Sequence, residues 1–280
     1  MDFISKLENA WSERQTMVCV GLDPRMDRLP ASLRGAPDPF FAFNRRVIES
    51  TLPHACAYKP QIACYAGEDR LDELRRTLEF LKERAPEVPL ILDAKRGDIG
   101  STAEQYAREA FEVYKADAVT VNPYMGGDTL APFTDWPDRG VIVLCRTSNP
   151  GSADLQNLIL ESGEPLYLEV ARKAFGEWNE KGNLCLVTGA TYPGDLAKIR
   201  QVAGKMPLLV PGIGAQGGDL EATLRAGLRP DGWGLLINSS RGIIHAASGE
   251  DFAEAAGEAA RGLKEACSRL RAVIMAGGGA

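Results

Sequence analysis

Residues 90–98 of this 280-residue chain read Leu-Ile-Leu-Asp-Ala-Lys-Arg-Gly-Asp, so three apolar residues pass directly into charged ones. A short apolar run without polar alternation is typical of a strand buried on both faces of a parallel sheet. Side chains two residues apart on a strand face the same way, so we expect Asp93 and Lys95 to point together from the end of this strand. Asp98 follows on the turn, where it either reaches back or reaches a neighbouring subunit.

The same pattern of an apolar run followed by a polar or Gly/Pro-rich turn recurs seven more times. These runs are 17–21, 55–58, 118–121, 141–145, 184–187, 208–210 and 234–237, and helical patterns lie between them at 71–84, 102–114, 166–179 and 220–226. From about residue 23 to about residue 239 the run ends are spaced by about 31 residues, the length of a strand–helix unit. Eight such units predict an α/β fold, a (β/α)8 TIM barrel.

The first turn argues against the main competitor, an open doubly wound sheet. Such a sheet usually carries G-x-G-x-x-G after its first strand, whereas this chain has Gly-Leu-Asp-Pro at 21–24. An amphipathic pattern over 252–275 predicts a closing helix. We expect one barrel domain over 1–280, with a short flexible tail at 276–280.

Composition limits the possible partners. Apolar residues make up 45% of the chain and charged residues 25%, and the formal net charge is −6. This balance argues against nucleic acid or an anionic membrane as the main partner, but it allows an anionic substrate in a local basic pocket. Six cysteines without a C-x-x-C pair, and no signal-like N-terminus or long apolar run, predict a cytoplasmic protein with reduced thiols. The chain has two histidines, which disfavours His-rich metal sites.

The polar residues at the predicted strand ends are the candidate chemistry, because active sites of this fold lie at the C-terminal strand ends. Lys59 closes the strand before Asp93, so Lys59, Asp93, Lys95 and Asp98 are arranged to form a chain of alternating charges. A purely structural salt-bridge network is the alternative interpretation.

The loops after strands seven and eight form the recurrent phosphate site of this fold. Residues 211–219 read PGIGAQGGD, and their glycines, including Gly214 and Gly217, let backbone N–H groups approach phosphate oxygens. Arg241 follows strand eight and is able to clamp a phosphate through two hydrogen bonds. Ordinary glycine turns beside a surface arginine remain the alternative.

Two further features stay open at this level. Residues 145–152, Cys-Arg-Thr-Ser-Asn-Pro-Gly-Ser, are either a lid over the ligand or an ordinary connecting loop. Asp23, which follows the first strand, is either a helix N-cap or an acceptor for a ribose hydroxyl.

The run 92–103, LDAKRGDIGSTA, resembles the signature of orotidine 5′-phosphate decarboxylases, most closely that of the longer, type 2 bacterial branch. Supporting matches occur in family order at 21–24, 58–60, 147–151, 211–218 and 238–241. The Asp-x-Lys-x-x-Asp element is shared with sister enzymes that act on sugar phosphates, but the whole set is much more specific. Extra length around 24–43 and 149–183 departs from the shorter members, and no role is assigned to it.

The resemblance implies a role for each matching residue. Lys95 would donate a proton to C6 of the pyrimidine of orotidine 5′-monophosphate, and Asp93 would lie beside the departing carboxylate. Lys59 would bind the ribose and hold Asp93. The remaining implied contacts are Asp98 and Thr102 from the partner of a homodimer with shared active sites, Asp23 to the ribose, Ser148 to the pyrimidine, and Gln216, Arg241, Gly214 and Gly217 to the phosphate.

The implied reaction yields uridine 5′-monophosphate and CO2 and requires neither a cofactor nor a metal. Two other functions remain as alternatives. One is a metal-dependent decarboxylase or synthase acting on a sugar phosphate, which would need further carboxylates near Asp23 to hold Mg²⁺. The other is a catalytically silent barrel that binds nucleotides.

Overall fold

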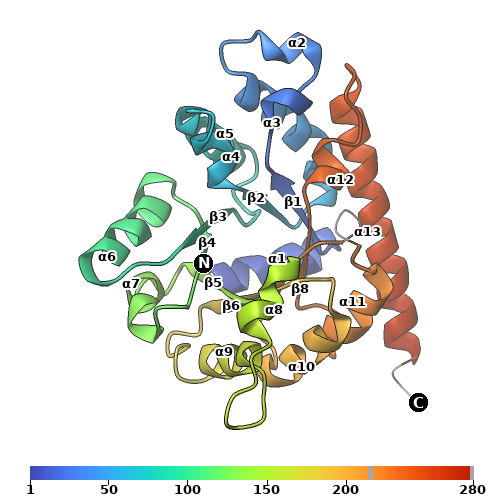
Figure 1. The fold of residues 1–280 in the computed structure, drawn as a ribbon. Coiled ribbons are helices and arrows are strands. Elements are labelled where there is room, and N and C mark those ends of the chain that lie inside the picture. The colour runs from blue at the N-terminus through green and yellow to red at the C-terminus, as the bar shows by residue number, and fades with distance from the viewer. Residues whose placement is uncertain (214–216, 278–280) are drawn as a thin grey trace.

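The computed structural model describes residues 1–213 and 217–277, and it confirms the predicted TIM barrel (Figure 1). One sheet of parallel strands has the order β2-β1-β8-β7-β6-β5-β4-β3. The strands are β1 (Val18–Leu22), β2 (Ala57–Pro60), β3 (Ile91–Arg96), β4 (Ala118–Val121), β5 (Gly140–Arg146), β6 (Leu184–Thr188), β7 (Leu208–Pro211) and β8 (Leu235–Ser239).

The ring closes between β2 and β3. Isolated parallel bridges join Tyr58 to Leu90 and Gln61 to Asp93, and the Tyr58 amide donates to the Pro89 carbonyl at 3.0 Å. Closure brings Lys59 of β2 next to the charged end of β3. The arrangement therefore gives the barrel a single mouth at the C-terminal strand ends.

Helices surround the strands as expected for this fold. The longer ones are α1 (Phe3–Arg14), α3 (Pro39–Thr51), α5 (Leu71–Arg84), α6 (Gly100–Arg108), α9 (Leu166–Phe175), α10 (Pro193–Ala203), α11 (Leu220–Gly227) and α13 (Phe252–Gly277). The shorter turns are η1 (Met26–Arg28), α2 (Ala31–Arg34), η2 (Leu52–His54), α4 (Ile62–Ala66), η3 (Glu109–Val113), η4 (Gly127–Thr129), α7 (Ala131–Thr134), η5 (Pro150–Ser152), α8 (Ala153–Gln156) and α12 (Arg241–Ile244).

Local sequence explains several helix boundaries. The carboxylate of Asp219 accepts the Ala222 amide at 2.8 Å and caps α11. Helix α5 matches its predicted range, with acidic residues in its first turn and basic residues in its last, as the helix dipole favours. The helix predicted over 102–114 is interrupted, because α6 ends at Arg108 and a π-turn, η3, follows it.

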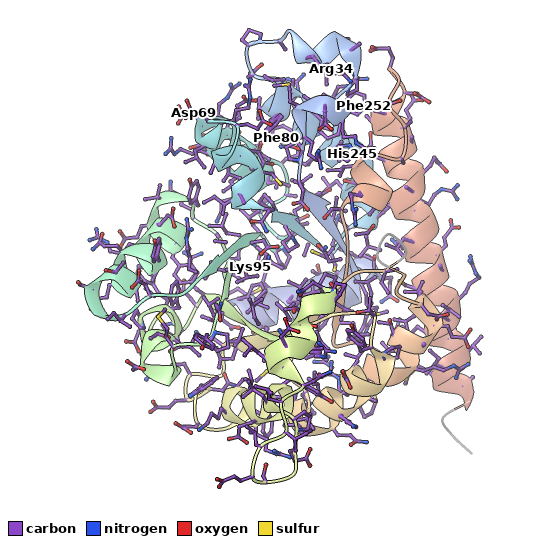
Figure 2. All side chains as sticks on the ribbon, in the orientation of Figure 1. Arg34, Asp69, Phe80, Lys95, His245 and Phe252 are labelled. Atoms are coloured by element: carbon purple, nitrogen blue, oxygen red, sulfur yellow. The ribbon has the colours of Figure 1, made fainter. Side chains whose placement is uncertain are left out.

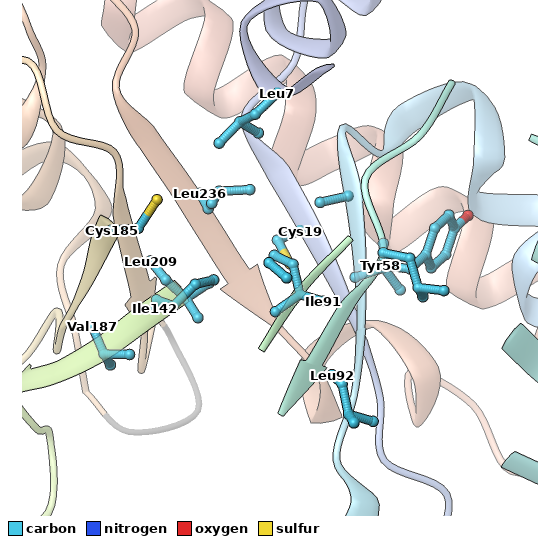
Figure 3. Close-up of a cluster of buried hydrophobic side chains, with 14 of the residues drawn as sticks. Leu7, Cys19, Tyr58, Ile91, Leu92, Ile142, Cys185, Val187, Leu209 and Leu236 are labelled. Carbon is cyan, nitrogen blue, oxygen red and sulfur yellow. The ribbon is translucent and has the colours of Figure 1, made fainter. Parts of the chain in front are cut away.

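Helix α1 closes the barrel end opposite the mouth. Asp2 caps it by accepting the Ser5 amide at 2.9 Å. The Phe3 ring packs where a side chain on Gly140, the first residue of β5, would otherwise lie. Leu7 of α1 belongs to the buried cluster inside the barrel, with Leu236 of β8 (Figure 3).

Helix α13 runs along one side of the molecule (Figure 1) and packs on α3. The rings of Phe252 and Phe43 stack there with centroids 5.0 Å apart. The helix continues to Gly277, two residues into the segment predicted as a tail; residues 278–280 lie outside the described residues. None of the described helices is long and apolar enough to cross a membrane.

Candidate active site

A cavity of about 450 Å³ opens at the mouth of the barrel. Lys59 of β2, Asp93 and Lys95 of β3, and Thr120 of β4 line one part of it. In Figure 2 Lys95 lies near the centre of the molecule, at the end of β3. The structure therefore brings together three of the four residues in the predicted chain of alternating charges.

A second hollow of about 270 Å³ shares Lys59, Asp93 and Pro211 with this cavity, so the two are parts of one mouth. Its remaining walls come from α4, from the end of β8 with the start of α12, and from the loops after β1 and β7. They are Asp23, Arg25, Cys64, Gly212, Ile213, Asn238, Ser239, Ser240 and Arg241.

Asp93 is the centre of the ion network. Its Oδ2 accepts from Lys59 Nζ at 2.8 Å, and its Oδ1 accepts from Lys95 Nζ at 2.6 Å. The side chains of Lys59 and Asp93 are 5% and 10% exposed, whereas that of Lys95 is 45% exposed. The chain thus buries two members of the network and presents the third to the cavity.

Burial and neighbouring charges shift the pKa values of Asp93 and Lys59 in opposite directions. Burial disfavours the carboxylate of Asp93, but the ammonium groups of Lys59 and Lys95 outweigh it and hold the pKa of Asp93 well below its usual range. Burial likewise opposes the charge on Lys59, yet Asp93 and Asp23 hold the pKa of Lys59 above its usual range. Asp93 and Lys59 are therefore both charged at neutral pH.

The backbone at Lys95 departs from a regular strand. Its φ angle is +46°, in the left-handed region that a non-glycine residue rarely adopts. The contact between Lys95 and Asp93 therefore depends on an irregular strand end rather than on the two-residue alternation that predicted it. Sequence analysis also missed Thr120, whose hydroxyl donates to Asp93 Oδ1 at 2.8 Å.

Ser148 lies beyond the end of β5, against the wall of the same cavity. A side chain on Gly189 would come within 2.8 Å of the Ser148 Cβ atom, so the glycine allows Ser148 to pack close to the end of β6. Gln156 of α8 accepts the Thr147 amide at 2.9 Å and lines the cavity as well. The segment predicted as a lid or a loop thus folds over one side of the mouth.

Arg146 holds this segment from below and was not predicted as a site residue. Its side chain is 1% exposed, and its Nε donates to Asp195 Oδ2 at 2.9 Å. It also lies over the ring of Tyr192, 4.0 Å from the centroid, and donates to Ser152 and Gln156. A signal existed in the sequence, because an arginine directly after an apolar run needs partners if it is buried.

Asp23 accepts the Gln61 amide on its Oδ1 at 3.1 Å. It does not cap a helix, since the cap position of η1 is Arg25, so this alternative is wrong. Asp23 instead faces the second hollow of the mouth, beside Lys59.

The phosphate prediction falls partly on described residues. Arg241 begins α12 directly after β8 and lines the second hollow. Gly217 adopts a φ of +84°, and Gly218 donates its amide to Gly212 at 3.1 Å. Gln216 and Gly214 lie outside the described residues.

Asp98 and Thr102 are not among the residues that line either part of the mouth. Asp98 Oδ1 accepts the amide of Ile99 at 2.8 Å, and Thr102 is exposed on α6. Within one copy of the chain, the structure therefore leaves the last acidic residue of the predicted network apart from the other three.

No group of three or more His, Cys, Asp and Glu side chains is placed to hold a metal ion in the described parts of the chain. A larger and mainly apolar hollow of about 550 Å³ lies behind Leu144 and Gln156, which line both it and the mouth. It contains none of the charged network.

Comparisons with known proteins agree with the geometry. Residues 16–256 match the model of the orotidine 5′-phosphate decarboxylase / HUMPS family. An orotidine 5′-phosphate decarboxylase from Bordetella pertussis is 54% identical over 272 residues, covering 97% of this chain and all of the relative. One from Azoarcus sp. is 54% identical over 271 residues with the same coverage.

Solved structures show the same fold. The OMP decarboxylase of Leishmania donovani superposes with a TM-score of 0.83 at 41% identity, over 97% of this chain and 99% of that one. A putative orotidine-monophosphate-decarboxylase of Toxoplasma gondii has a TM-score of 0.88 at 36% identity, over 98% of each chain.

Proposed function

The chain belongs to the orotidine 5′-phosphate decarboxylase / HUMPS family and has orotidine 5′-phosphate decarboxylase activity, that of a carboxy-lyase of pyrimidine biosynthesis; on this premise we propose that Lys95 carries the chemical step. The supporting observation is the position of its ammonium group in the cavity, 2.6 Å from the buried carboxylate of Asp93.

Loss of CO2 from C6 leaves an electron pair on a carbon with no adjacent carbonyl to delocalise it, so the protein has to stabilise the charge directly. A fixed ammonium at Lys95 would stabilise the developing negative charge, and the more so once the mouth closes over the substrate and water leaves. The same group then donates its proton to C6, so that Lys95 becomes a neutral amine and the carbon–hydrogen bond of uridine 5′-monophosphate forms. Repulsion between Asp93 and the substrate carboxylate adds to the driving force.

Substrate binding is assigned to the other side of the mouth. We propose that Arg241, with Gln216, Gly214 and Gly217, binds the phosphate, because an arginine fork and glycine amides are the groups that phosphate recognition uses. Ser148 would contact the pyrimidine and Asp23 the ribose, and Lys59, on the side of the charged network, would also contact the ribose. Binding energy from the remote phosphate would drive closure over the ring of segment 147–156, which comprises the turn after β5, η5 and α8.

We further propose that the active unit is a homodimer in which Asp98 and Thr102 complete the partner's site. Two observations support this: neither residue lines the mouth of its own chain, and apolar side chains nearby are open to solvent, with Ile99 62% and Tyr124 78% exposed. The six cysteines are free, which suits a reducing cytoplasm.

The dimer is tested by mixing two inactive variants, Lys95→Ala and Asp98→Ala, under conditions that allow subunits to exchange. Each mixed dimer has one site with both residues intact, so about a quarter of the wild-type activity is expected at equal amounts. A mixture that stays inactive, although an affinity tag on one variant co-purifies the untagged other variant, would exclude the shared site.

The most direct test of the chemistry is an ultraviolet assay of orotidine 5′-monophosphate consumption with EDTA present. We expect full activity for the wild type and almost none for Lys95→Ala. Loss of wild-type activity with EDTA, and its return with Mg²⁺, would favour the metal-dependent alternative. Binding of the nucleotide without turnover would favour the silent barrel.

A further inference from the structure

Strand β3 carries a bulge where it meets β4. Leu92 pairs with Val119, and the next regular pair joins Arg96 to Val121. Between these two pairs β3 advances by four residues and β4 by only two, so β3 carries extra residues here. Ala94 and Lys95 lie in this bulged part of β3. A bulge of this kind turns side chains in a new direction and is common beside active sites.

The hydroxyl of Thr120 takes the place of the missing ladder bonds. Its Oγ1 accepts the amide of Ala94 at 3.0 Å and the amide of Lys95 at 2.9 Å, and it donates its hydrogen to Asp93 Oδ1 at 2.8 Å. These three bonds use the full capacity of a hydroxyl group. Thr120 is 1% exposed, so water cannot replace them without rearrangement.

We propose that Thr120 is a positioning residue of the decarboxylation: its hydroxyl holds the bulge that directs the ammonium of Lys95 into the cavity and fixes the carboxylate that pairs with it. The inference rests on the role of Lys95 in the proposed function. A left-handed backbone at a non-glycine residue persists only where its surroundings hold it, and Thr120 binds the two successive amides that lead into the Cα atom of Lys95.

The same hydroxyl has a second effect during the reaction. When Lys95 gives its proton to carbon, Asp93 Oδ1 loses the charge of its closest donor. The Thr120 hydroxyl still donates to that oxygen, and Lys59 still donates to Oδ2. Asp93 therefore keeps its orientation through the step, and Lys95 is ready to take up a proton again.

The test compares Thr120→Val, which keeps the shape and removes the hydroxyl, with Thr120→Ser, which keeps the hydroxyl. We expect the valine variant to lose about 10- to 100-fold in kcat while KM for orotidine 5′-monophosphate changes less than about threefold. The serine variant is expected to stay within about fivefold of the wild-type kcat, because it restores all three hydrogen bonds.

Thr77→Val is the matched control for a structural effect. Thr77 is fully buried in α5, where its hydroxyl donates to the Glu73 carbonyl and accepts from Asn44, away from the mouth. Its loss is expected to lower Tm and leave kcat unchanged. Should Thr120→Val lower Tm in the same way and keep the wild-type kcat, the proposed role of Thr120 is wrong. A rise in KM at constant kcat would equally overturn it.

If Thr120→Val does not fold, the test uses Thr120→Cys instead, because a thiol is only a weak donor and acceptor. Its kcat is expected to fall below that of the serine variant, and an equal kcat would overturn the proposal. Lys95→Ala is measured alongside as a reference. If it kept turnover, the proposed function itself would fail, whereas an inactive Lys95→Ala with an unaffected Thr120→Val would remove only the inference about Thr120.

Discussion

The two sides of the barrel mouth are built differently. On the side of β2, β3 and β4, the charged groups lie on the strands, and Asp93 is held by three donors within 2.8 Å. On the side of β5, β7 and β8, the predicted binding groups lie on loops and short turns, and Arg241 is exposed at the start of α12.

This difference between strand-borne and loop-borne groups matches two proposed tasks, the chemical step and the binding of the substrate. A group that stabilises a transition state has to be fixed before the substrate arrives, because reorganisation during the reaction costs the energy that the site is meant to supply. Groups that bind the phosphate and the ring have to let the substrate enter and then close over it. The strand side of the mouth therefore fits the first task and the loop side fits the second.

The largest effect is expected from Lys95→Ala on the strand side. Turnover should fall by at least about 10⁴-fold, since the variant loses both the electrostatic stabilisation and the proton donor. Circular dichroism should show an unchanged fold, and uridine 5′-monophosphate should still bind. A variant with a measurable fraction of wild-type kcat would mean that the strand side is structural.

Arg241→Ala tests the loop side. We expect kcat/KM for orotidine 5′-monophosphate to fall by about 100-fold, from the loss of charge-assisted hydrogen bonds to the phosphate. Orotidine, which lacks the phosphate, should react equally slowly with the variant and the wild type. Wild-type efficiency in the variant would show that the phosphate is not bound there.

Asp195→Asn probes the ion pair that anchors segment 147–156 on the loop side. The buried guanidinium of Arg146 would lose its charged partner, so segment 147–156 should be held less firmly, and kcat/KM should fall about tenfold. Cleavage after the exposed Glu161 by a glutamate-specific protease should become faster. Glu177→Gln, which breaks an exposed pair with Lys173, is the control and should change neither measurement.

The smallest effect concerns acid stability. Because the pKa of Asp93 is lower in the folded chain than in the unfolded one, its contribution to stability is present above the unfolded pKa of about 3.9 and is lost as the pH falls below it. Between about pH 4 and pH 2, the free energy of unfolding of the wild type should fall by about 1–2 kcal/mol more than that of Asp93→Asn. Urea unfolding at several pH values measures this difference, and parallel pH profiles would contradict it.

Much of the strand side follows from the sequence. All eight apolar runs became strands, because a buried parallel strand has no polar face and its composition alone identifies it. Lys59, Asp93 and Lys95 were placed together for the same reason, since parallel strands end at one rim. Strand β4 has the predicted bounds, whereas β3, predicted over 90–92, continues through its charged residues to Arg96.

The rest depends on tertiary contacts that no local pattern contains. The roles of Thr120 and Arg146 arise from bonds to residues 25 and 49 positions away in the chain, in a bulge and a buried ion pair. Helices α1, α3 and α10 were not predicted, and the first five residues of α3 lie in the 24–43 segment to which the sequence assigned no role. The capping role considered for Asp23 failed because its carboxylate binds the Gln61 amide instead.

The left-handed backbone of Lys95 lowers the stability of the fold at the residue proposed for the chemical step. A lysine in this conformation costs about 1–2 kcal/mol, which glycine would not incur. Selection for heat resistance alone would therefore favour replacement of the ammonium group to which we assign the chemical step. Stabilised versions of this chain for practical use have to be sought elsewhere in the molecule, with position 95 held constant.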